Sequence, residues 1–433
     1  MRYLARAFLS GEQTVEAVIA RGNETLGREW RWLRSLARRY VAASEGQTRP
    51  RLRDVIEFLS HDELFQRARV RHRRAIHVVQ RIAGAHRMQP VAATSDWGVP
   101  PIESVAELAA WLRLSSAEAE WFADLKHLQR KSATTEQLRH YHYRLAAKRS
   151  GGIRLIEAPK ERLKTLQRRI LADILDRIPP HAAAHGFVHE RNIKTFAAPH
   201  AAQHILLRID LRDFFPSIRR ARVQTIFRTL GYPEPVADLL GGITTTCTPR
   251  DVFRGAPQVD LAHLRALYVQ SHLPQGAPTS PALANACCYR LDCRLAGLAE
   301  AAGAQYTRYA DDLAFSGDVA FARGAERFAS HAAAIALEEG FAVNFRKTRI
   351  MRRGVQQHLA GLVVNEHVNI KRDDFDRLKA TLTNCVRNGA AAENREHRSD
   401  FRAHLAGRVA FVQSINPTRG QRLRASLDRI DWN

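Results

Sequence analysis

Cysteine and lysine are scarce in this sequence of 433 residues, and no long apolar run is present. The five cysteines form no C-x-x-C pair and match no histidine spacing, so the sequence predicts neither a zinc site nor a disulfide framework. Lysine occurs 9 times against 58 arginines, and none precedes Lys126. No apolar run reaches the ~18 residues of a membrane span. We therefore expect a cytoplasmic protein with no membrane partner.

Acidic residues are also in deficit, which leaves a formal net charge of +23 and a pI near 10.6. An excess of this size is typical of proteins that bind a polyanion such as nucleic acid. Hydrophobic residues make up 45% and charged residues 26% of the chain, a composition that predicts a folded enzyme rather than a disordered segment.

The first 90 residues form a basic region that we expect to be helical, with 18 arginines against 9 acidic residues. This region could follow phosphates, and a solvated helix face is the alternative. Proline and glycine interrupt the pattern at residues 91–102, which we interpret as a linker.

Two short segments bring aspartates to the places where strands end. A β-branched run at residues 205–209 leads into Asp210, which predicts a buried strand that ends in a carboxylate. Residues 306–316 alternate around Asp311 and Asp312, which predicts a hairpin with this pair at its tip. Phosphoryl transfer with two divalent cations needs converging carboxylates of this kind. Adjacent aspartates in a turn are, taken alone, more often ordinary solvated residues.

The segments around these aspartates resemble the motifs of retron reverse transcriptases, in the order of that family. The three main motifs are LRIDLRDFFPSI at 207–218, LPQGAPTSP at 273–281 and YTRYADDLAFSG at 306–317. The flanking blocks that agree are GGIRLIEAP at 151–159, LKTLQR at 163–168, AHGF at 184–187, NFRKT at 344–348, and Gly407 through INP at 415–417. The resemblance covers roughly residues 103–430.

This resemblance implies an α+β fold of the right-hand polymerase class, which follows the basic N-terminal region. Fingers and palm would occupy residues 103–365, with a small antiparallel sheet in the palm, and a helical thumb would occupy residues 366–433. Residues 346–433 hold 18 Lys and Arg against 9 acidic residues, which suits helices beside a nucleic-acid duplex.

The resemblance also assigns site residues. Asp210, Asp311 and Asp312 match the catalytic ligands of two Mg²⁺ ions, with Mn²⁺ as an alternative, and the backbone carbonyl of Leu211 lies beside them. The residues that match nucleotide-binding positions are Arg154, Phe215, Gln275, Gly276 and Lys347. Arg154 suits the triphosphate as a bidentate donor. Gly276 lets the backbone approach the nucleotide closely.

Two blocks depart from the family pattern. The Asn-Ala-x-x-His block reads FAAPH at 196–200, and the Val-Thr-Gly block reads LAG at 359–361. His200 and Gly361 survive from these blocks, which are expected to recognise the cognate RNA, and a structural role is the alternative for His200. The departures keep open a different defence-associated reverse transcriptase, with untemplated or protein-primed synthesis. A non-catalytic RNA-binding scaffold is a further alternative.

The resemblance implies several partners as well. A structured non-coding RNA would serve as template and primer, deoxynucleotides as substrates, and RNA-linked, msDNA-like single-stranded DNA as product. An associated effector protein in anti-phage defence is also expected.

Phe215 generates a prediction about substrate choice. Its position matches the bulky residue that, in reverse transcriptases, lies under the sugar and would leave a ribose 2′-hydroxyl crowded and without a hydrogen-bond partner. We expect Phe215→Ala to raise ribonucleotide incorporation, measured as the ratio of deoxynucleotide to ribonucleotide use in primer extension. An unchanged ratio would remove this role from Phe215.

Overall fold

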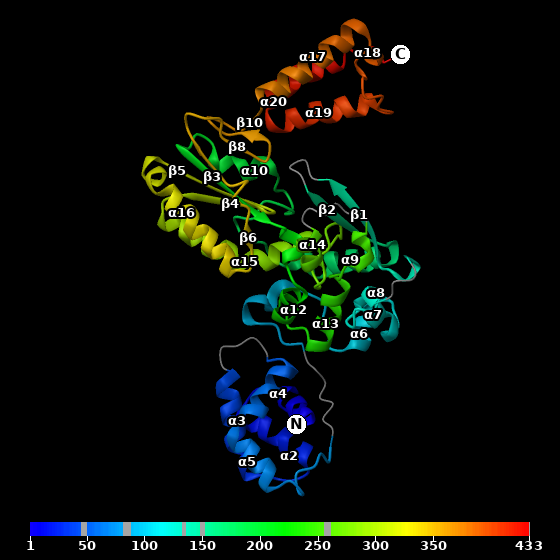
Figure 1. Ribbon diagram of the computed structural model, residues 1–433, viewed down its shortest axis with the longest axis vertical. Coiled ribbons are helices and arrows are strands. Elements are labelled where there is room, and N and C mark those ends of the chain that lie inside the picture. The colour runs from blue at the N-terminus through cyan, green and yellow to red at the C-terminus, as the bar shows by residue number, and fades with distance from the viewer. Residues whose placement is uncertain (45–49, 81–87, 132–135, 148–151, 255–260, 433) are drawn as a thin grey trace. The chain divides into compact units, whose positions relative to one another are not determined.

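The computed structural model describes residues 1–44, 50–80, 88–131, 136–147, 152–254 and 261–432 (Figure 1). The chain forms two compact units, each made of segments that are distant in sequence. Unit 1 comprises Met1–Ile178 and Ile218–Leu283, and unit 2 comprises Pro179–Ser217 and Ala284–Asn433. The expected mixture of helices with small antiparallel sheets is confirmed. The predicted domain boundaries near residues 90, 102 and 365 stay predictions.

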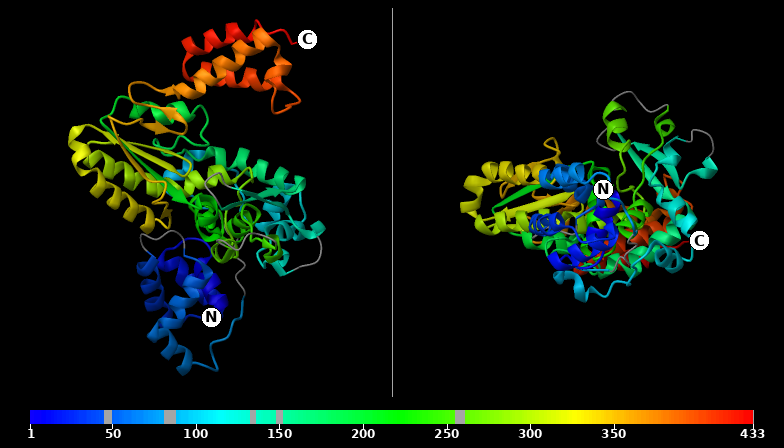
Figure 2. Two further views of the ribbon diagram at one scale, coloured as in Figure 1. Left: turned by 45° about the horizontal axis from the view of Figure 1, so that its top comes forward. Right: turned by 90° about the horizontal axis from the view of Figure 1, so that it is seen from below.

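Unit 1 begins with five helices that share an apolar core of their own, drawn in blue in Figures 1 and 2. These are α1 (Arg2–Leu9), α2 (Val15–Leu26), α3 (Arg31–Ser44), α4 (Leu52–His61) and α5 (Glu63–Arg71). The predicted linker contains a 3-10 helix, Ala92–Trp97, and the backbone N–H of Gln89 donates to the carbonyl of Gly231 at 3.0 Å.

The rest of unit 1 surrounds a two-stranded antiparallel hairpin. Its strands are β1 (Tyr141–Ala147) and β2 (Ile153–Pro159). The strand β2 belongs to the GGIRLIEAP block at 151–159, of which Gly151 lies outside the described residues. The helices of this part are α6 (Val105–Leu112), α7 (Ser116–Ala123), α8 (Leu128–Lys131), α9 (Glu161–Asp173), α12 (Arg220–Thr229), α13 (Glu234–Ile243) and α14 (Leu261–Tyr268).

Unit 2 is built on a five-stranded antiparallel sheet in which β3 (Ile205–Arg212) is central. Seven of its eight residues are buried or half-buried because β3 has neighbours on both edges. The other strands are β4 (Gln305–Tyr309), β5 (Asp312–Gly317), β6 (Ala342–Val343) and β7 (Arg349–Arg352). Helix α16 (Val319–Glu338) packs on β3, β5, β6 and β7, which gives the sheet its apolar cover.

A small sheet and a helical bundle complete unit 2. The sheet consists of β8 (His358–Leu359), β9 (Leu362–Val363) and β10 (Asn369–Ile370). The bundle consists of α17 (Arg372–Asn388), α18 (Ala390–Glu393), α19 (Phe401–Ile415) and α20 (Pro417–Leu427), drawn in orange to red in Figure 2. The short helices α10 (Ile193–Ala197) and α11 (Phe214–Ser217) flank β3 in sequence. Helix α15 (Ser280–Ala301) begins in unit 1 and continues into unit 2.

A buried ion pair holds the β4–β5 hairpin against α15. Arg308 on β4 and Asp292 on α15 are both fully buried, and the guanidinium donates to both carboxylate oxygens at 2.7 and 2.6 Å. Arg308 also donates to Asn285 Oδ1 at 3.0 Å and to the carbonyl of Ala310 at 3.2 Å. Its four contacts therefore join the helix to the turn of the hairpin.

This pair gives a stability prediction. Arg308→Met would leave Asp292 charged and buried without its cationic partner, with the hydroxyl of Tyr306 as a remaining donor, and the loss of one member of a buried ion pair typically costs about 3–5 kcal/mol. We expect a lower urea midpoint for the full chain. The double variant Arg308→Met/Asp292→Leu should recover part of the loss, because it removes the stranded charge as well. If Arg308→Met alone unfolds at the same urea concentration as the wild type, the proposed contribution of the pair is contradicted.

Within the described residues, no helix has the length and apolar character needed to cross a membrane.

Candidate active site

The register of the central sheet places two of the predicted aspartates side by side. Asp210 on β3 lies directly opposite Asp312 on β5. Directly opposed residues in antiparallel strands have Cβ atoms roughly 5 Å apart and share one face of the sheet. Asp210 is only 4% exposed, on a strand that is central in its sheet. Strand pairing thus brings together carboxylates about a hundred residues apart in sequence.

Asp311 lies in the turn between β4 and β5, while Asp312 is the first residue of β5. The preceding residue, Ala310, has a φ of 55°, in the left-handed region that alanine seldom adopts. Gly186 packs against this turn so closely that an added Cβ would lie 2.5 Å from the Ala310 nitrogen. The N–H of Leu211 donates to the Asp311 carbonyl at 2.9 Å, which ties the turn to β3.

Two cations balance part of the negative charge. Lys347 Nζ lies 2.9 Å from Asp210 Oδ1, and Arg208 Nε donates to Asp312 Oδ1 at 2.9 Å. Burial, together with the charges of Asp312 and Asp210, raises the pKa of Asp311 to about 6. Burial also raises the pKa of Asp312, although Arg208 opposes this shift. The site therefore carries more negative charge than its own cations neutralise.

The donor set suits a hard divalent cation, since carboxylate oxygens are the ligands that Mg²⁺ prefers. Among the described residues, however, no three His, Cys, Asp or Glu side chains are gathered closely enough to hold a metal ion as they stand. Lys347 and Arg208 engage two of the three carboxylates instead. The chemistry of the residues fits the metal, with Asp210, Asp311 and Asp312 as the side chains that would hold it.

The two neighbouring phenylalanines have different environments. Phe214 is 5% exposed and stacks on Phe341 with ring centroids 5.8 Å apart, so it belongs to the core. Phe215 is half-buried, and its ring lies 6.0 Å from that of Phe187. Phe214→Ala is consequently a poor control for Phe215, because it would open a cavity in the core.

The remaining nucleotide-binding candidates lie in unit 1. Arg154 is an exposed residue of β2, and the N–H of Glu157 on that strand donates to the carbonyl of Gln275 at 2.9 Å. Gly276 has a φ of 130°, and an added Cβ would lie 3.1 Å from the Glu157 carbonyl oxygen. Glu157 is itself buried beside His272, with Oε2 and Nε2 2.9 Å apart. Unit 1 thus fixes the predicted loop to the strand that carries Arg154.

His200 lies inside the sheet rather than on a surface. It is fully buried, with Nδ1 2.7 Å from Ser316 Oγ and Nε2 2.7 Å from Thr307 Oγ1. Burial, with a smaller effect of His185, lowers the pKa of His200 to about 3, so the ring is neutral at physiological pH. His200 therefore links β4 to β5, and any influence on RNA recognition would be indirect.

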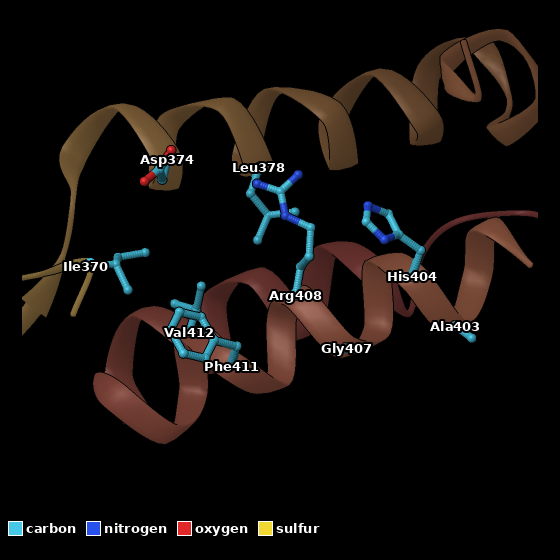
Figure 3. A pocket seen from close by; sticks show the side chains of 10 residues that line it. Ile370, Asp374, Leu378, Ala403, His404, Gly407, Arg408, Phe411 and Val412 are labelled. Atoms are coloured by element: carbon cyan, nitrogen blue, oxygen red, sulfur yellow. The ribbon is translucent and has the colours of Figure 1, made fainter. Parts of the chain in front are cut away.

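Gly361 borders a groove of about 550 Å³ between α17 and α19. Figure 3 shows Asp374 and Leu378 on α17 facing His404 and Arg408 on α19. The full lining is Gly361, Ile370, Asp374, Leu378, Ala403, His404, Gly407, Arg408, Phe411 and Val412. Apolar side chains with a few polar groups around them are typical of ligand grooves.

Sequence reasoning missed three contacts of this site. Arg208 could have been suspected, because it lies two residues before Asp210 and so on the same face of its strand. The pairing of Arg308 with Asp292, and the approach of Phe187 to Phe215, depend on tertiary packing that no local pattern reveals.

Sequence comparisons match this part of the chain to known proteins. A family profile described as "Reverse transcriptase (RNA-dependent DNA polymerase)" matches residues 146–376, a span that contains all three aspartates. The retron Mx65 reverse transcriptase of Myxococcus xanthus is 45% identical over 295 residues, which cover 66% of this chain and 64% of that protein. This chain therefore spans less than two thirds of the length of that relative.

Two further relatives are similar over comparable lengths. The retron Mx162 reverse transcriptase of Myxococcus xanthus is 35% identical over 353 residues, which cover 77% of this chain and 68% of that protein. The retron Ec86 reverse transcriptase of Escherichia coli is 30% identical over 280 residues, which cover 64% of this chain and 77% of that protein.

The raised pKa of Asp311 gives a prediction for the metal-free protein. Folding raises this pKa from 3.8 to about 6, so the folded protein binds the proton of Asp311 more tightly than the unfolded chain does. The stability that this gives is complete below pH 3.8 and is lost as the pH rises through 6. At pH 8, ionised Asp311 should cost up to about 3 kcal/mol. We expect Asp311→Asn to raise the Tm at pH 8 in the presence of a chelator, and to have little effect near pH 4.

Asp312→Asn is the matched control, because it removes the negative charge that pairs with Arg208 and should therefore stabilise less than Asp311→Asn. If Asp311→Asn has a lower Tm than the wild type at pH 8 with the chelator present, the predicted charge repulsion is contradicted.

Proposed function

Because the chain belongs to the retron-type reverse transcriptases, we propose that it is an RNA-directed DNA polymerase that copies part of a structured non-coding RNA into single-stranded DNA. The family profile covers more than half of the chain, and two relatives that are at least 30% identical, Mx162 and Ec86, are covered over more than two thirds of their length. The product would be RNA-linked and msDNA-like, and its synthesis would serve anti-phage defence.

One observation carries the catalytic part of the proposal: Asp210 opposes Asp312 across the strand pair, with Asp311 in the adjoining turn. These three side chains would hold two Mg²⁺ ions, or Mn²⁺ in their place, with the carbonyl of Leu211 beside them. When bound, the ions would activate the attacking hydroxyl and stabilise the leaving phosphates. Before they bind, Lys347 and Arg208 keep the carboxylates oriented and partly neutralised.

Each nucleotide-binding candidate would keep the role that its place in the family motif implies. Arg154 would bind the triphosphate, and Gln275 and Gly276 would border the nucleotide, on a loop held to β2. Lys347 would bind near the departing pyrophosphate, since its ammonium group already sits beside Asp210. Phe215 would exclude a ribose 2′-hydroxyl, a role that suits its half-buried ring.

The groove of Figure 3 supports a role of the thumb in RNA recognition. It joins Gly361, predicted to recognise the RNA, to the basic Arg408 and to Phe411, whose ring is 47% exposed. Arginine binds phosphates, and an exposed aromatic ring can stack on a base. We propose that this groove contacts the cognate RNA in the cytoplasm, and that an effector protein acts with the complex.

Sequencing the nucleic acid that co-purifies with the wild-type protein tests the proposal. A branched, RNA-linked DNA of defined sequence is the expected result. DNA of random sequence would contradict the retron assignment and favour untemplated or protein-primed synthesis. RNA without any DNA would contradict the polymerase assignment itself.

A catalytic variant provides the matched comparison. Asp311→Asn/Asp312→Asn should abolish the DNA while leaving the RNA bound, because the substitutions keep the size of the side chains and remove only their charge. Asp176→Asn, at an exposed position of unit 1, should leave DNA synthesis unchanged. Full phage protection by the double variant would instead favour a non-catalytic RNA-binding scaffold.

A further inference from the structure

Residues 181–192 of unit 2 form a tightly closed loop. The Nη1 of Arg191 donates to the carbonyls of Ala182 and Ala184, each at 2.7 Å, which closes the loop from inside. Phe187 and Glu190 have φ values of 62° and 61°, in the left-handed region that costs a residue other than glycine about 1 kcal/mol or more. A loop that holds two such residues is fixed by its surroundings rather than by local preference.

Backbone hydrogen bonds join the same loop to the hairpin that carries Asp311. The N–H of His185 donates to the carbonyl of Arg308, and the N–H of Arg308 donates to the carbonyl of Ala183, both at 2.7 Å. Asn285 Nδ2 donates to the carbonyl of Gly186 at 2.9 Å. Arg308 and Asn285 also bond to each other. The residue that follows Gly186 is therefore held at a defined place beside the aspartates.

That residue, Phe187, contributes little to any core. Its side chain is 48% exposed, and its ring centroid lies 6.0 Å from that of Phe215 and 6.5 Å from that of Tyr309. A single exposed aromatic ring is ordinary by itself. Here the backbone of Phe187 is left-handed, and the ring lies near both Phe215, which is proposed to contact the sugar, and Tyr309, two residues before Asp311.

We propose that the ring of Phe187 stacks on a nucleobase at the position where synthesis occurs. This inference rests on the proposed function, because it needs nucleic acid or nucleotide beside Phe215. A phenyl ring offers no hydrogen bond, so it would accept any of the four bases and contribute affinity without selecting sequence. The base could belong to the incoming nucleotide or to the template–primer, and the two sources differ in what they predict.

Phe187→Ala and Phe187→Tyr test the proposal in the full chain. Base stacking on an aromatic ring typically contributes enough affinity that its loss weakens binding roughly tenfold or more. We expect Phe187→Ala to raise either the KM for the deoxynucleotide or the Kd for a template–primer by about this factor. A tyrosine keeps the aromatic face, so Phe187→Tyr should restore values close to those of the wild type.

Tyr289→Ala is the matched control. Tyr289 is an equally exposed aromatic residue, at 51%, and its ring lies 5.6 Å from that of His181 at the other end of the loop. This variant should leave both constants unchanged. Because Phe187 and Tyr289 are exposed, neither substitution should lower the Tm appreciably.

The outcomes separate the sources of the base. A raised KM for the nucleotide with an unchanged Kd for the template–primer supports stacking on the incoming base, and the reverse result supports stacking on the nucleic acid. Unchanged values for both would overturn the proposal, as would equal losses in the alanine and tyrosine variants. The Kd is measured without catalysis, so a wild-type protein that bound template–primer but made no DNA would contradict the proposed function alone.

Discussion

Three carboxylates that are held together repel one another, and much of unit 2 acts against that repulsion. Strand pairing fixes Asp210 opposite Asp312, and the turn adds Asp311, whose pKa rises to about 6 as a result of burial and of the other two charges. Lys347 and Arg208 offset part of the charge from within the unit. The remaining negative charge is uncompensated in the folded protein, and it is this charge that the proposed divalent cations would balance.

The carboxylates stay close despite their repulsion only if the β4–β5 hairpin is held firmly. The buried ion pair of Arg308 and Asp292 provides this support. A buried ion pair is weak evidence for stability, since a well-packed apolar pair can replace it at little cost. Its value here is geometric, because the same guanidinium reaches the helix α15, the turn at Ala310 and the amide of Asn285. His200 adds a second link between β4 and β5.

Much of this arrangement could be predicted from sequence because it depends on local patterns. The β-branched run before Asp210 and the alternation around Asp311 each match one element of the structure, β3 and the β4–β5 hairpin. The hairpin differs in detail, since its turn is formed by Ala310 and Asp311 while Asp312 begins the strand. The hydrophobic periodicity of a strand does not extend into its turn, so the sequence pattern could not predict which residues form the turn.

What could not be predicted involves partners brought together by the tertiary fold. His200 lies more than a hundred residues from both Thr307 and Ser316 in the sequence. Its structural role is visible only in the fold, where its ring hydrogen-bonds to both side chains. The discontinuous units are a similar case, because α15 continues from one unit into the other without any break in its sequence pattern. Composition and motifs indicate the chemistry of the site, whereas the residues that hold the site in place can be identified only from tertiary contacts.

The cross-strand register also has a genetic consequence. Side chains alternate between the two faces of a strand, so a shift of one residue in β3 turns every side chain to the opposite face. An in-frame insertion or deletion of a single codon between Ile205 and Asp210 would preserve all three aspartates in the protein, yet it would separate Asp210 from Asp312. Such alleles would still encode all three aspartates, but in a protein in which the carboxylates no longer meet.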